Sequence, residues 1–304
     1  IQVQENSSQF VLSTLVTGAT SCFQAMAGIV VVFDFDKTIV DVDSDNWLVD
    51  ELGATDLFNR LLPTMPWNSL MDRMMTEFHS QGKTIDDIAG VLKRIPIHPR
   101  TIPAIKSAAA LGCDLKIVSD ANAFFIETIL NHHGLRDYFS EIFTNPSFVN
   151  AQGRLRILPH HDFTVSPHGC ANLCPPNMCK GCVLERMIEE SGKKSRFVYL
   201  GDGSGDYCAV LKLGDGDLVM PRRNFPLWEL IRNDPKAIKA GVHEWSDGED
   251  LERVLPRLLS PAPAPPRAPS HHAPGGECVR FTSMPTALSA APEAITPALL
   301  PVPH

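Results

Sequence analysis

The feature that most constrains the fold is an unbroken apolar run at residues 28–33 that leads into two acids, Asp34 and Asp36. The run is rich in β-branched residues, which is typical of a strand buried on both faces of a parallel sheet. Acids two residues apart can project together from the carboxyl end of such a strand, where open α/β sheets bind ligands. Because two neighbouring carboxylates repel each other, the pattern predicts a site for a hard cation such as Mg²⁺.

Two further apolar runs also end in polar residues. The strand predicted at 113–120 closes with Ser119 and Asp120, and the strand predicted at 196–200 is followed by the sequence GDGSGD at 201–206. Helical patterns lie between these strands, at 121–133 and 183–190. Alternating strands and helices predict an α/β fold with a doubly wound parallel sheet.

The hydrophobic pattern divides the chain into four parts. Residues 28–46 and 106–258 form the predicted α/β core, and residues 47–105, which show only helical periodicity, form a small helical cap inserted after the two acids. Residues 1–27 carry little pattern and are expected to be a loose tail. Residues 261–304 hold eleven of the 25 prolines and many alanines without a periodic apolar face, so we expect disorder.

Composition excludes several partner classes. The formal net charge of −8 argues against a protein that binds nucleic acid through phosphate contacts. No apolar run is long enough to span a bilayer. The weakly apolar stretch at 10–17 follows no basic residue, so a signal peptide is not expected. A cytoplasmic protein is the default expectation, with thiols that are free or metal-bound rather than paired.

The motifs, taken in order, resemble those of the haloacid dehalogenase superfamily of phosphohydrolases. The matching positions are DFDKT at 34–38, Ser119, Lys180 and GDGSGD at 201–206. The resemblance implies that Asp34 is a nucleophile that forms an aspartyl-phosphate. It also implies that Asp36 protonates the leaving oxygen and then takes a proton from water. Each acid also has a purely structural reading, as a solvated strand end or a helix cap.

The same resemblance assigns the remaining positions. Asp34, the backbone carbonyl of Asp36, and Asp202 would hold Mg²⁺, while Asp206 would orient the lysine or a metal-bound water. Ser119 would donate a hydrogen bond to a phosphoryl oxygen, although a serine there can also cap the next turn. Lys180 would neutralise developing charge. Its rivals for that role are Lys193 and Lys194.

A closer resemblance is to the phosphoethanolamine/phosphocholine phosphatase family. It rests on DFDKTIVDVDSD at 34–45, VSDAN at 118–122, CPPNMCK at 174–180 and GDGSGDYC at 201–208. That family includes plant members that act on pyrophosphate and relatives described as pyridoxal-phosphate phosphatases. It implies a small phosphorylated substrate, either phosphocholine-like, phosphoethanolamine-like or pyrophosphate, with pyridoxal phosphate or thiamine monophosphate as alternatives. Asp45 and Asp120 would meet a cationic head group, and Lys37 replaces the Glu common in animal members.

Three alternatives are weighed on the sequence. Cys170, Cys174, Cys179 and Cys182, with His168, could form a structural zinc site, or could be reduced thiols that pack a tight loop presenting Lys180. A non-catalytic binding protein on the same fold would be expected to lack a catalytic acid, and none is lacking here. A phosphotransferase or mutase would need a second bound acceptor, which no feature demands.

Overall fold

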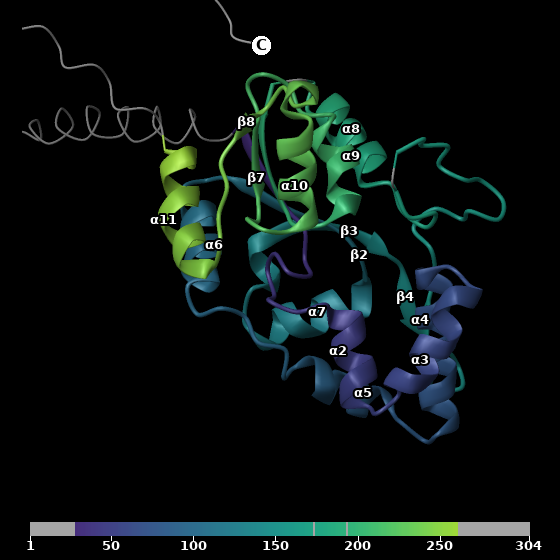
Figure 1. Cartoon of the computed structure of the whole chain (residues 1–304). Helices are drawn as coiled ribbons and strands as arrows, with labels where there is room; N and C mark the ends of the chain where they lie inside the picture. The colour runs from purple at the N-terminus through teal and green to yellow at the C-terminus, as the bar shows by residue number, and fades with distance from the viewer. Residues whose placement is uncertain (1–27, 173, 193, 261–304) are drawn as a thin grey trace, which may run out of the picture. The chain divides into compact units, whose positions relative to one another are not determined.

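The computed structural model describes residues 28–172, 174–192 and 194–260, and Figure 1 gives their arrangement. Its centre is a parallel six-stranded sheet in the order β3-β2-β1-β6-β7-β8. The strands are β1 Ile29–Phe33, β2 Asp114–Asn122, β3 Phe139–Asn145, β6 Arg196–Gly201, β7 Leu218–Pro221 and β8 Gly241–Val242. From β1 the chain adds β2 and β3 on one side of that strand. It then returns to add β6, β7 and β8 on the other side. The predicted doubly wound parallel sheet is therefore confirmed.

Both faces of the sheet are buried, as the apolar run at 28–33 predicts. Val31 and Phe33 belong to one apolar cluster and Val30 and Val32 to another, because successive side chains of β1 point to opposite faces. Helices α6 Thr101–Ala110, α7 Ala123–His132 and α11 Gly248–Leu259 contribute to the first cluster. Helices α8 Lys180–Glu190, α9 Tyr207–Val210 and α10 Pro226–Asn233 contribute to the second. Figure 1 shows α6 and α11 on the side of the strands away from α8, α9 and α10.

The stretch between β1 and β2, all of whose residues the structure describes, contains helices joined by turns and no strand. It contains α2 Ser44–Glu51, α3 Thr55–Leu61, η1 Leu62–Thr64, α4 Trp67–Ser80 and α5 Ile85–Leu92. Thr84 begins α5 with a reciprocal capping box to Asp87. The next helix, α6, spans the predicted boundary at 105 and 106 and packs against α11. The assignment of 47–105 as a separate cap stays a prediction.

A small hairpin supports the helices of this region. Strands β4 Ser147–Val149 and β5 Leu155–Ile157 pair antiparallel around the turn at Gln152 and Gly153. Asp72 of α4 accepts hydrogen bonds from Arg156 Nε and from the Ile157 backbone N–H, both at 2.9 Å. The hairpin thus ties α4 to a segment that follows β3.

The remaining described elements are short 3₁₀ turns: η2 Arg136–Tyr138, η3 Ser204–Asp206 and η4 Pro235–Ala237. Among the described helices, none combines the length and apolarity that crossing a membrane requires. The predictions for the tails at 1–27 and 261–304 lie outside the described residues.

The buried sheet predicts a large difference between two identical substitutions. Val198→Ala in β6 removes methyl groups from a fully buried position, whereas Val242 in β8 is 45% exposed. We expect Val198→Ala to lower the free energy of unfolding by about 2 kcal/mol and Val242→Ala by about 0.5 kcal/mol or less. Urea denaturation of the two variants measures this. Equal losses would contradict the described burial of β6.

Candidate active site

Three adjacent strands deliver the predicted acids and serine to one edge of the sheet. Phe33, the last residue of β1, lies in register with Ile117 of β2 and with Leu200 of β6. Asp34 follows Phe33 directly, whereas Ser119 lies two residues after Ile117. Asp202 likewise lies two residues after Leu200. All three side chains are buried. The Asp34 backbone N–H donates to the Leu200 carbonyl at 2.8 Å, which extends the pairing of β1 with β6 to the acid itself.

Lys180, the first residue of α8, places its ammonium group among these acids. Its Nζ lies 2.8 Å from Asp34 Oδ1, 2.8 Å from Asp206 Oδ1 and 3.9 Å from Asp120 Oδ1. Burial lowers the pKa of Lys180, but the charges of Asp206 and Asp34 outweigh burial and raise that pKa well above its usual value. The lysine therefore stays charged. Lys194, one of its predicted rivals, precedes β6 at the opposite end of the strand.

Asp206 is held by four donors. Its Oδ1 accepts from Lys180 Nζ at 2.8 Å and from the Tyr199 hydroxyl at 2.7 Å. Its Oδ2 accepts from the backbone N–H groups of Asp202 at 3.1 Å and Gly203 at 2.9 Å. Both oxygens are thus occupied, so Asp206 fits an orienting role for the lysine better than a direct metal contact.

Two residues that support Asp206 were not predicted. Tyr199 lies in the interior of β6, where a fully buried hydroxyl must find a partner, and Asp206 provides it. Gly201 is also required, because a Cβ there would lie 2.6 Å from Asp206 Cγ. The sequence did hold one signal for this contact: Tyr199 is a polar aromatic residue inside an otherwise apolar strand.

The carboxylates at this edge fit a divalent cation. Oxygens of Asp34, Asp202 and Asp206 lie within 4.8 Å of one another. Burial and the charge of Asp206 raise the pKa of Asp34 well above its usual value and that of Asp202 to about 7. The crowding of these carboxyl groups would be relieved by a bound cation, and Mg²⁺ prefers oxygen ligands of this kind.

Asp36 has the surroundings of a proton donor. Its Oδ2 accepts from the Ser44 hydroxyl at 3.0 Å, and its buried Oδ1 has no hydrogen-bond partner among the described residues. Burial, followed by the charges of Asp43 and Asp45, raises the pKa of Asp36 well above its usual value. A carboxyl group with a raised pKa holds its proton more firmly and can deliver it to a leaving oxygen.

Both predicted head-group acids line one cavity beside this edge. The cavity has a volume of about 230 Å³ and is lined by Asp36, Asp43, Asp45, Trp67, Asp120 and Ala121. Asp45 is buried and accepts from Trp67 Nε1 at 2.7 Å. Burial, with the charge of Asp43, raises the pKa of Asp45 to about 8. Asp120 lies within β2, and its side chain is about half exposed (48%).

Arg222 is a further residue that the sequence did not reveal. It follows β7, and its guanidinium donates to the Lys37 carbonyl at 2.6 Å and to Asp41 Oδ1 at 2.8 Å. Lys37 has a positive φ of 55°, so the turn after Asp36 is tight. Arg222 fixes that turn from a strand about 180 residues away in sequence. An arginine after a short strand gave no signal of this contact.

Two of the predicted zinc ligands, Cys182 and His168, are corrected by the structure. Sulfurs of Cys170, Cys174 and Cys179 come together with that of Cys208, rather than that of Cys182. Cys208 was not considered because it lies in α9, 26 residues beyond Cys182 in the sequence. His168 is not a ligand either, since Nδ1 accepts from the Cys170 backbone N–H and Nε2 contacts the Pro175 carbonyl, both at 3.1 Å.

Comparison with known proteins shows the family of the chain. The model of a family described as "Putative Phosphatase" matches residues 29–259. The chain belongs to this family. It is thus a phosphatase of the haloacid dehalogenase type, as the motifs predicted, and the reading as a non-catalytic binding protein is not favoured.

Three curated relatives illustrate the range of the family. Inorganic pyrophosphatase 2 of Arabidopsis thaliana is 63% identical over 235 residues, which are 76% of this chain and 84% of that protein. A thiamine phosphate phosphatase-like protein of the same plant is 56% identical over 238 residues, or 77% of this chain and 97% of that one. The human phosphoethanolamine/phosphocholine phosphatase is 32% identical over 240 residues, which are 75% of this chain and 88% of that protein.

The contacts of Asp206 predict a role for Tyr199. Tyr199→Phe removes one of four donors to Asp206 and loosens the position of Lys180, so we expect kcat for phosphate release to fall about threefold to tenfold. Tyr138→Phe, which loses a hydroxyl in η2, serves as the matched control and should keep the wild-type rate. Wild-type turnover in Tyr199→Phe would show that its hydroxyl does not help position the lysine.

Proposed function

We propose that this chain is a Mg²⁺-dependent phosphatase that works through an aspartyl-phosphate on Asp34. The observation that carries the proposal is the buried Asp34 carboxylate, 2.8 Å from the Lys180 ammonium at the carboxyl end of the central strand. A carboxylate at this point can attack phosphorus, and attack splits a difficult hydrolysis into two easier steps. Lys180 offsets charge that develops on the phosphoryl oxygens.

The other residues supply proton transfer and orientation. Asp36 gives its proton to the leaving oxygen and, once ionised, accepts a proton from the water that attacks the aspartyl-phosphate. The Ser119 hydroxyl accepts from the Ala121 N–H at 3.2 Å, which leaves its own proton free to bind a phosphoryl oxygen. Asp34, the Asp36 carbonyl and Asp202 would hold Mg²⁺, whose charge would screen the phosphate from the carboxylates.

The acidic cavity favours a substrate with a cationic leaving group. Four carboxyl groups, those of Asp36, Asp43, Asp45 and Asp120, line a space of about 230 Å³ beside the phosphate position. A bound cation would stabilise the ionised form of Asp45 and so lower its raised pKa. Thiamine monophosphate, phosphocholine and phosphoethanolamine all carry such a charge.

Pyrophosphate is the second candidate substrate. It is supported by the 63% identity to a plant protein named inorganic pyrophosphatase 2. The leaving phosphate is an anion, so the acids of the cavity would have to act through additional Mg²⁺ ions. The two candidates therefore differ in what Asp45 and Asp120 contact.

The nucleophile assignment predicts an inactive variant that still folds. Asp34→Asn replaces the attacking carboxylate with an amide, so phosphate release should fall below about a hundredth of the wild-type rate. Asp215→Asn, in an exposed loop, is the control and should retain full activity. Circular dichroism of both variants checks the fold. Turnover of Asp34→Asn close to that of the control would exclude Asp34 as the nucleophile.

The cavity predicts how specificity changes when its acids are neutralised. With a cationic leaving group, Asp45→Asn or Asp120→Asn should lower kcat/KM about tenfold or more, because each carboxylate attracts the cation in a partly desolvated space. With pyrophosphate, the same variants should mainly raise the Mg²⁺ concentration needed for half-maximal rate.

The measurement is phosphate release from thiamine monophosphate, phosphocholine, phosphoethanolamine, pyridoxal phosphate and pyrophosphate over a Mg²⁺ titration. Asp50→Asn, on the exposed side of α2, is the matched control. Small and equal losses on every substrate would show that neither acid contacts the leaving group.

A further inference from the structure

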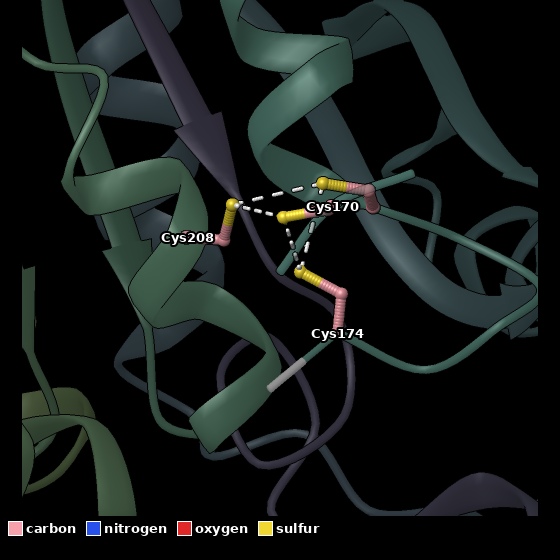
Figure 2. Close-up of side chains that lie close together, drawn as sticks. Cys170, Cys174 and Cys208 are labelled. Atoms are coloured by element: carbon pink, nitrogen blue, oxygen red, sulfur yellow. Dashed lines mark hydrogen bonds between the residues drawn. The ribbon is translucent and has the colours of Figure 1, made fainter. Parts of the chain in front are cut away.

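Four cysteines outside the phosphate site bring their sulfurs together. Cys170 and Cys174 come from the loop before α8, Cys179 is the N-cap residue of α8, and Cys208 lies in α9. The Sγ–Sγ distances are 3.5 Å for Cys170–Cys208, 3.7 Å for Cys170–Cys174, and 3.6 Å for both Cys174–Cys179 and Cys179–Cys208. All four sulfurs lie within 4.8 Å of one another. Figure 2 shows the sulfurs of Cys170, Cys174 and Cys208 directed at a common centre.

These distances match a tetrahedral metal site. Zinc binds thiolate sulfur at about 2.3 Å, so the edges of a regular ZnS₄ tetrahedron are about 3.8 Å long. We propose that Cys170, Cys174, Cys179 and Cys208 bind one structural Zn²⁺ ion. Four protein ligands complete the coordination, which leaves no open position for substrate or water. On binding, the four thiols release their protons to solvent, and the four thiolates with Zn²⁺ form a complex with a net charge of −2.

Amide N–H groups point at three of the four sulfurs. The Asn172 side-chain amide donates to Cys208 Sγ at 3.3 Å and to Cys170 Sγ at 3.6 Å, and the Cys182 backbone N–H donates to Cys179 Sγ at 3.4 Å. Such donors stabilise negative sulfur ligands. Cys179 also caps the amino end of the 11-residue helix α8, where the helix dipole favours negative charge. Two disulfides would instead require sulfur pairs at about 2.05 Å.

The proposed site joins two segments that carry the phosphate site. Lys180 follows Cys179 directly, and Cys208 lies two residues after Asp206. The lysine and Asp206 make a 2.8 Å contact, so one ion would fix both ends of that pair. Gly181 permits the approach, because a Cβ there would lie 2.4 Å from Cys208 Sγ. The zinc would therefore be a structural element that positions Lys180 without touching substrate.

His168 braces the loop that delivers two of the ligands. Its Nδ1 accepts from the Cys170 backbone N–H and its Nε2 contacts the Pro175 carbonyl, both at 3.1 Å. This requires the neutral tautomer with the proton on Nε2. The imidazole thereby spans the turn that contains Cys170 and Cys174, and holds its ends at a fixed separation.

The decisive experiment is a metal count on the full chain. Protein purified through a tag without histidine, and without chelators, should contain about one zinc per chain by inductively coupled plasma mass spectrometry. Cys208→Ser should contain less than about a fifth of that amount, because a structural zinc site needs all four ligands. Cys182→Ser is the matched control, since Cys182 lies in the same helix as Cys179 but outside the group, and should keep its zinc.

A second measurement covers the case in which Cys208→Ser does not fold. Removing zinc from the wild-type chain with a strong chelator should lower its melting temperature by about 10 °C or more, and added Zn²⁺ should restore it. Non-reducing mass spectrometry should find all four cysteines as thiols after the metal is removed. Wild-type protein without zinc, protein with iron in its place, or disulfides among the four cysteines would each overturn the proposal.

Discussion

The structure depends on one buried cation placed between two carboxylates. Lys180 lies 2.8 Å from both Asp34 and Asp206, and all three side chains are almost inaccessible to water. Burial disfavours the charged form of an ammonium group, but the charges of Asp206 and Asp34 outweigh burial and raise the pKa of Lys180 well above its usual value. A buried cluster of this kind tolerates little displacement. The surrounding strands and helices hold these three side chains in place.

The sheet contributes the part of this arrangement that local sequence encodes. A parallel sheet ends its central strands at one edge, so Asp34, Ser119 and Asp202 meet wherever strands 29–33, 114–122 and 196–201 are neighbours. Apolar runs followed by polar residues were enough to predict that edge. The capping box at Thr84 and the hairpin turn at Gly153 are equally local features.

The contacts that the sequence did not reveal are those between distant segments. Tyr199 could be placed in a strand, but its hydroxyl contact with Asp206 depends on how the chain turns back after that strand. Arg222 reaches Lys37 and Asp41 from the far half of the sheet. Cys208 replaces Cys182 among the grouped thiols because α9 packs against α8, and spacing along the chain carries no trace of that packing. Periodicity predicts elements, whereas their mutual contacts follow from tertiary packing.

Hard and soft ligands are separated on either side of Lys180, and this separation explains how the proposed ions would coexist. Carboxylate oxygens of Asp34 and Asp202 suit Mg²⁺, while the thiol group that includes Cys179 and Cys208 suits Zn²⁺. A soft metal that entered the carboxylate site would gain no thiolate, and Mg²⁺ gains little from sulfur. The residue between the two sites is a lysine, whose positive charge repels any cation that would bridge them. The amino end of α8 can then be anchored by one metal while its first side chain faces the other.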